Sequence, residues 1–195
     1  MPPGDIDTHS GCRLALPRRD KLDAAGQATY DRLADPAGGT LRGLRGPGGI
    51  QLHSPELSRL SRPLNHYLRT GIEFGGRVRE LAILVTARAL DSRFEWAAHE
   101  AEARREGVPD QVIEIVRHRR PTEGLTEADA VVIELGREIF TARKVSPQTY
   151  TRALARFGRR GLVDLVALMG NYAATAALLT AFDMQLDPGT APPLP

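Results

Sequence analysis

Glu80, Glu95 and His99 are the residues whose types and spacing best fit acid–base chemistry. Glu95 and His99 are four residues apart, so on a helix their side chains share one face. Glu80 lies on the helix predicted before theirs, and a tight turn at residues 91–92 makes the two helices antiparallel neighbours. Because two carboxylates and an imidazole shift one another's pKa, the three side chains would together form a proton-transfer cluster.

Each of these residues also has an ordinary structural interpretation. Ser92-x-x-Glu95 matches a capping box, in which Ser92 begins a helix and Glu95 reaches back to its backbone amide. His99 is equally explained as an exposed or hydrogen-bonded helix residue. Glu80 follows two arginines that favour a surface ion pair. The spacing alone therefore leaves catalytic and structural roles open.

The elements that must position these residues are all helical. Apolar residues recur at helical spacing, Ser-Pro and Thr residues mark helix starts, and no segment alternates as a strand does. The pattern predicts an all-α bundle with roughly seven or eight helices. The helices are expected at residues 22–33, 55–68, 77–90, 93–106, 109–118, 126–143, 147–157 and 162–186.

The chain is expected to form one helical domain over residues 21–187. An irregular arm, residues 1–20, precedes this domain, and a proline-rich tail, residues 188–195, follows it. The glycine-rich segment 36–54 has no helical period and is predicted to be a loop. A loop of that length inside a compact domain often has a functional or interface role.

Three motifs in the centre of the chain resemble the carboxymuconolactone decarboxylase family. They are R-E-L-A-I-L-V at residues 79–85, F-E-W-A-A-H-E-A-E-A at 94–103 and G-V-P at 107–109. Looser similarity extends the resemblance to residues 20–187. The family has a peroxidase branch, called AhpD-like, and a decarboxylase branch without redox cysteines.

The peroxidase motif is a Glu, eleven residues, and then Cys-x-x-Cys-x-x-x-His. Counting from Glu80 places Ser92 and Glu95 at the two cysteine positions and His99 at the histidine. The chain has a single cysteine, Cys12, which has no partner for a thiol-based peroxidase cycle. The resemblance is therefore to the branch that lacks the CxxC pair.

The decarboxylase branch implies a cofactor-independent lyase that acts on a small unsaturated carboxylic acid or lactone, as in aromatic degradation. Under that resemblance His99 is the general acid/base, Glu80 orients it and Glu95 takes part in proton transfer. The candidate substrate-binding residues are Arg88, Arg93, Trp96 and Ser92. A guanidinium fits a substrate carboxylate, although a solvated helix position explains either arginine equally. Trp96 is alternatively a core or interface residue.

Under the decarboxylase resemblance no cofactor is expected, because the unsaturated lactone supplies its own electron sink. No metal is expected either, because one histidine and two glutamates make a poor ligand set. The family resemblance implies a homo-oligomer, a trimer or a hexamer. A non-catalytic helical oligomer that binds a ligand or partner is the alternative function, and a peroxidase is third.

The remaining composition indicates a cytoplasmic protein without nucleic-acid or membrane partners. The net charge is +2, and arginines alternate with acidic residues instead of forming a basic block. The N-terminus lacks the basic and apolar regions of a signal peptide. The apolar stretch 162–186 contains four polar residues, which favours a buried helix over a membrane span.

Overall fold

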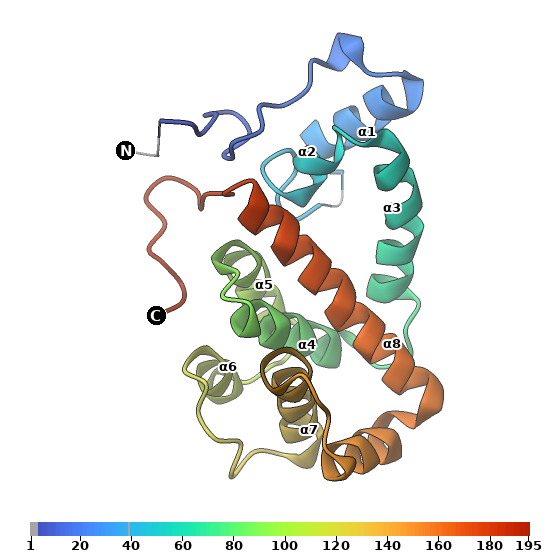
Figure 1. Cartoon of the computed structure of the whole chain (residues 1–195), viewed down its shortest axis with the longest axis vertical. Helices are drawn as coiled ribbons and strands as arrows, with labels where there is room; N and C mark the ends of the chain where they lie inside the picture. Colours follow the sequence, from blue (N-terminus) through green and yellow to red (C-terminus); the bar gives the residue numbers. More distant parts are fainter. Residues whose placement is uncertain (1–3, 39) are drawn as a thin grey trace. The chain divides into compact units, whose positions relative to one another are not determined.

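The computed structural model describes residues 4–38 and 40–195, and within them it is helical without any strand (Figure 1). Residues 1–3 of the predicted arm and Gly39 of the predicted loop lie outside the described residues. The all-α prediction is confirmed. The elements are η1 (Arg19–Lys21), α1 (Ala24–Ala34), α2 (Pro47–Gln51), α3 (Pro55–Thr70), α4 (Gly76–Ala89), α5 (Arg93–Arg105), α6 (Asp110–Arg117), α7 (Glu127–Arg137), η2 (Glu138–Ala142) and α8 (Pro147–Ala181).

Local signals set most of the helix starts. The Thr126 hydroxyl accepts a hydrogen bond from the backbone N–H of Asp129 at 3.3 Å, which caps α7. Ser146 caps α8 in the same way, because its hydroxyl accepts from the backbone N–H of Thr149 at 3.1 Å. After α5 the chain turns at Gly107, whose φ is +85°. These contacts satisfy backbone groups that a helix end leaves unpaired.

Two stretches differ from the sequence prediction, and the end of the chain agrees with it. The glycine-rich segment 36–54 is not entirely a loop, because Pro47 begins the short helix α2. The helix predicted to reach residue 143 ends at Arg137 and continues as a π-helical turn, η2. The two helices predicted after residue 146 are present as the two halves of α8, which meet at a kink at Gly158 (φ 66°, ψ 178°); the second half ends at Ala181 (Figure 1). That backbone conformation is nearly exclusive to glycine.

Contacts divide the chain into two compact units, and the division falls inside α3 and α8. The first unit contains residues up to Asn65 together with Ala177–Thr190, and the second contains His66–Ala176 together with Ala191–Pro195. In the first unit the N-terminal arm pairs with the segment after α8. The Arg13 N–H donates to the Phe182 carbonyl and the Gln185 N–H donates to the Gly11 carbonyl, each at 2.8 Å. The domain boundaries at residues 21 and 187 stay predictions.

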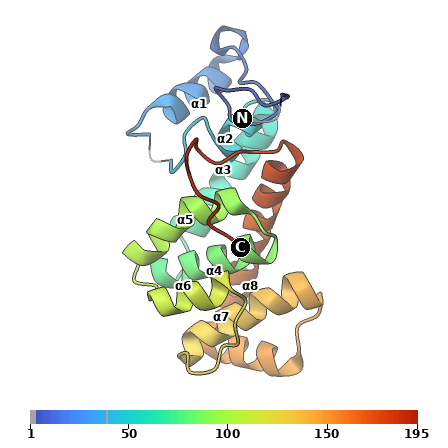
Figure 2. The same cartoon turned by 90° about the vertical axis from the view of Figure 1, so that its left-hand side faces the viewer.

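Helix α4 is the centre of the second unit. Every residue from Glu80 to Arg88 is buried, and α4 contacts α5, α6 and α7 (Figure 2). A helix buried on all sides needs apolar residues around most of its circumference, and residues 81–85 provide them. The fully buried core side chains include Leu81, Ile83, Leu84, Ile133, Leu165, Leu168 and Met169. This packing fixes the position of the one carboxylate that α4 carries into the core, Glu80.

Helix α8 is, among the described helices, the one long and apolar enough to cross a membrane. A core helix passes the same test of length and composition, and Leu165, Leu168 and Met169 of α8 have no exposed surface. The length and composition of α8 therefore do not assign it to a membrane. The end of the proline-rich tail also packs on the second unit. Leu194 is buried, and a guanidinium N–H of Arg117 donates to the Pro193 carbonyl at 2.6 Å.

Candidate active site

His99 and Glu80 form a buried hydrogen-bonded pair in the second unit. The distance between His99 Nδ1 and Glu80 Oε2 is 2.7 Å, and their side chains are 4% and 1% exposed. Glu80 comes from α4 and His99 from α5, and a turn at Leu90–Ser92 joins the two helices. An ionised carboxylate only accepts hydrogen bonds. His99 Nδ1 therefore carries a hydrogen and donates a hydrogen bond to Glu80. The other ring nitrogen, Nε2, is then the one available for proton transfer.

Glu80 is held from both sides. Its Oε1 accepts a hydrogen bond from Arg79 Nε at 3.0 Å, while its Oε2 accepts from His99. Burial would raise the pKa of Glu80, but the hydrogen bonds and positive charges of His99 and Arg79 outweigh it and lower the pKa. Arg79 is itself fixed, because it also donates to the Arg69 carbonyl at 2.9 Å and to Glu106 at 3.1 Å. Glu80 is therefore an ionised, immobile partner for the imidazole.

Glu95 lies on the other side of the imidazole. Its Oε2 is 3.7 Å from His99 Nε2, within ion-pair range but longer than a hydrogen bond. The capping box does not form. Ser92 is at the N-cap of α5, but its side chain makes no cap bond and its backbone N–H donates to the Ala87 carbonyl at 2.8 Å. The alternative that Glu95 is held back as a capping residue is therefore wrong.

The comparison with family models assigns one stretch of the chain. Residues 55–135 match the model of the carboxymuconolactone decarboxylase family. This stretch belongs to that family. It contains Glu80, Glu95 and His99, so the resemblance drawn from the central motifs is confirmed. The comparison with curated proteins found no match, and the comparison with solved structures found none either.

The two positions that carry cysteines in the AhpD-like branch of the carboxymuconolactone decarboxylase family are Ser92 and Glu95, and both are buried. Glu95 replaces a sulfur with a carboxylate that faces the imidazole. Cys12, the single cysteine, belongs to the first unit, where it is buried and its thiol donates to the Leu14 carbonyl at 3.3 Å. The matched stretch therefore keeps the family's Glu and His and has a hydroxyl and a carboxylate in place of the thiols.

Trp96 is a core residue of the family stretch, with no exposed surface. Its indole N–H donates to Glu100 Oε2 at 2.7 Å, and the Arg117 guanidinium lies 5.3 Å from its ring centroid. These contacts fit the core interpretation of Trp96. Its role as a wall of the substrate pocket stays a prediction.

The structure does not bring Arg88 and Arg93 into the Glu80–His99 pair. Arg88 Nε donates to the Arg117 carbonyl at 2.6 Å, and its guanidinium also pairs with Asp91. Arg93 is exposed at the first position of α5. Among the described residues no group of three His, Cys, Asp or Glu side chains is arranged to hold a metal ion.

The sequence prediction of the site did not include Tyr172, although its place in an apolar helix indicated a need for a polar partner. Its ring meets the His99 ring edge-to-face, with centroids 5.1 Å apart and an interplanar angle of 87°. The only signal in the sequence was a tyrosine that interrupts the apolar stretch of α8. Arg79 and Arg69 were also outside the predicted site, although Arg79 bonds Glu80 directly.

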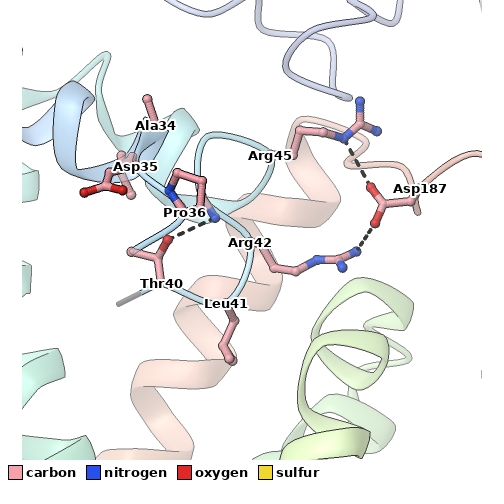
Figure 3. Close-up of a pocket in the computed structure, with 10 residues that line it drawn as sticks. Ala34, Asp35, Pro36, Thr40, Leu41, Arg42, Arg45 and Asp187 are labelled. Atoms are coloured by element: carbon pink, nitrogen blue, oxygen red, sulfur yellow. Dashed lines mark hydrogen bonds and ion pairs between the residues drawn. The ribbon is translucent and has the colours of Figure 1, made fainter. Parts of the chain in front are cut away.

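A separate cavity of about 410 Å³ lies in the first unit, between the end of α1 and the glycine-rich segment (Figure 3). In it Arg42 and Arg45 each bind one oxygen of the Asp187 carboxylate, at 3.1 and 3.3 Å. None of the predicted site residues lines this cavity. The functional or interface role expected of the glycine-rich segment stays a prediction.

Proposed function

We propose that this protein is a cofactor-independent lyase or proton-transfer enzyme that acts on a small unsaturated carboxylic acid or lactone. One observation carries the proposal: a buried imidazole bonded at Nδ1 to an ionised carboxylate, with a second carboxylate 3.7 Å from Nε2. The three residues lie in the stretch that matches the carboxymuconolactone decarboxylase family. Carbon-acid chemistry needs such a positioned proton donor near neutral pH.

The proposed reaction is decarboxylation of a γ-carboxymuconolactone-like acid. The bond between carbon and the carboxylate breaks, CO2 leaves, and the electron pair moves into the unsaturated lactone carbonyl. Protonated His99 then delivers its Nε2 proton to carbon and becomes neutral, and a proton from solvent restores it. Glu80 stabilises the cationic imidazolium through Nδ1, as the carboxylate does in other carboxylate–histidine pairs. Proton transfer of this kind contributes about 10²–10⁴-fold to the rate.

The test is CO2 release from γ-carboxymuconolactone by the purified protein and by its His99→Ala variant. The matched control is His118→Ala, because His118 is exposed and lies at the end of α6. We expect His99→Ala to lose at least about 10²-fold in turnover and His118→Ala to match the wild type. Equal turnover in wild type and His99→Ala would reject the assigned role, and a folded but silent wild type would reject this substrate.

We also propose that the chain works as a homo-oligomer in the cytoplasm. Supporting this, Leu57, Leu60 and Leu64 form an apolar stripe on α3, and they are 45%, 58% and 50% exposed. A repeated apolar stripe on one helix face is typical of a surface that another subunit covers. Light scattering measures the molecular mass of the wild type and of Leu60→Glu, which places a charge in the apolar stripe. A monomeric wild type would contradict the proposal.

A further inference from the structure

Tyr172 is a buried phenol whose hydroxyl has no hydrogen-bond partner in the described part of the chain. The residue is 6% exposed and lies on α8 within the second unit. Tyr67 shows the usual arrangement, since its hydroxyl donates to Asp164 Oδ2 at 3.0 Å. Buried tyrosine hydroxyls normally find a partner, because an unpaired polar group loses its hydration without compensation. An unpaired phenol beside a candidate catalytic histidine therefore needs an explanation.

The hydroxyl is also not sealed inside the protein. Among the described residues, the fully enclosed polar side-chain atoms that accept or donate no hydrogen bond are Arg32 Nε, Arg45 Nε and Asp129 Oδ1. The last two form ion pairs instead, and the Tyr172 hydroxyl is not in this group. The small exposed part of Tyr172 thus includes an oxygen that solvent or a ligand can reach. A ligand oxygen could supply the missing hydrogen-bond partner.

The ring of Tyr172 belongs to the Glu80–His99 cluster. It packs edge-to-face on the His99 imidazole at 5.1 Å between centroids. Since Glu80 occupies Nδ1, the Tyr172 ring and the Glu80 bond together fix the plane of the imidazole. The Tyr172 hydroxyl and, in the protonated imidazole, His99 Nε2 are therefore two neighbouring proton donors of this cluster.

The charges around Tyr172 keep its hydroxyl protonated. Burial raises the pKa of the phenol, and the negative charges of Glu95 and Glu80 raise it further, against the positive charges of Arg69 and Arg79. Arg79 is committed to Glu80 and Glu106. Arg69 uses its carbonyl to accept from Arg79, and in the described chain its guanidinium forms no hydrogen bond or ion pair. Its charge is thus available to balance an anion near the phenol.

We propose that Tyr172 is a further catalytic residue, whose hydroxyl donates a hydrogen bond to the substrate oxygen that becomes an enolate. This inference rests on the proposed function. As CO2 leaves, the electron pair delocalises onto the carbonyl oxygen, and Tyr172 stabilises the new negative charge while keeping its own proton. The proton that reaches carbon comes from His99 Nε2.

The first test is Tyr172→Phe, which removes the hydroxyl and keeps the ring that packs on His99. The control is Tyr150→Phe, on the same helix but 52% exposed. Loss of one oxyanion donor lowers kcat about 10²–10³-fold, so we expect that loss for Tyr172→Phe with KM within about threefold. Tyr150→Phe should match the wild type. An unchanged kcat in Tyr172→Phe would overturn the inference.

A second measurement separates this inference from the proposed function. The anion 4-nitrophenolate mimics an enolate oxygen, and its visible absorbance reports binding without turnover. We expect the wild type and Tyr150→Phe to bind it, and Tyr172→Phe to bind at least about tenfold more weakly. Such binding without CO2 release would keep the Tyr172 oxyanion site and reject the decarboxylase reaction. CO2 release that depends on His99 but not on Tyr172, with equal probe binding in Tyr172→Phe, would keep the decarboxylase reaction and reject the Tyr172 oxyanion site.

Discussion

Nδ1 of His99 lies 2.7 Å from Oε2 of Glu80, and this contact joins helices α4 and α5, which pack against each other in the second unit. The contact depends on the turn between α4 and α5, where Asp91 adopts a left-handed conformation with φ of 51°. That turn folds α5 back along α4 and brings residues 80 and 99 together. The bond then sets which imidazole nitrogen remains free for chemistry.

The first prediction concerns the charge of Glu80. Glu80→Gln keeps the shape of the side chain but removes the anion that stabilises protonated His99. We expect turnover of γ-carboxymuconolactone to fall about 10²–10⁴-fold, by analogy with carboxylate loss in other carboxylate–histidine pairs. The matched control is Glu106→Gln, which also pairs with Arg79 but is 40% exposed. Equal losses in both variants would show that Arg79 positioning, and not the Glu80 charge, controls the reaction.

The second prediction is the pH dependence of stability. The pKa of Glu80 is lower in the folded protein than its usual value, so its ionised form stabilises the fold above the unfolded pKa of about 4.3. That contribution is lost as the pH falls through the lowered folded pKa. We therefore expect the gap in unfolding free energy between wild type and Glu80→Gln to be present at pH 7 and to shrink below pH ~4. Urea denaturation at several pH values measures it, and a gap that grows in acid would contradict the assignment.

Much of this site was predictable because it depends on short-range geometry. The i,i+4 spacing placed Glu95 beside His99, and the turn signal at residues 91–92 placed Glu80 on the neighbouring helix. The capping box failed because the Ser92 N–H is taken by the Ala87 carbonyl, a bond that depends on how the turn closes. The spacing of residues in the sequence does not show which acceptor, the Ala87 carbonyl or the Glu95 carboxylate, binds the Ser92 N–H.

Contacts between distant segments were not predictable from local patterns. Tyr172 is far from His99 in the chain, and only the packing of α8 brings their rings together. Arg88 has the chemistry to bind a carboxylate, yet its guanidinium is used by the Arg117 carbonyl and Asp91. The long bent helix α8 also needed the structure, because a glycine between two helical patterns is compatible with a loop or with a bend.

The third prediction tests the close approach of α7 to α4. A Cβ at Gly136 would lie 2.4 Å from Val85 Cγ1, with Met169 of α8 also in contact at 3.4 Å. Gly136→Ala should therefore destabilise the protein by about 1–3 kcal/mol, despite the better helix propensity of alanine. Val85→Ala removes the methyl group that fills this space, and it destabilises the protein because buried apolar contacts are lost. Because the two side chains share this space, the double variant should be less destabilised than the sum of the single variants. Additive losses in denaturant titrations would refute the contact.

The last prediction separates backbone strain from lack of space at two glycines of α8. Neither Gly158 nor Gly170 has any atom within 4 Å of an added Cβ. Gly158 has φ of 66° and ψ of 178°, where an alanine is strained by about 1–3 kcal/mol. Gly170 lies on the exposed side of the helix without a positive φ, so alanine there should stabilise by about 0.5–1 kcal/mol. We therefore expect Gly158→Ala and Gly170→Ala to shift the denaturation midpoint in opposite directions. A stabilising Gly158→Ala would mean that α8 runs straight through residue 158, and the bend that separates its two halves would then be absent in solution.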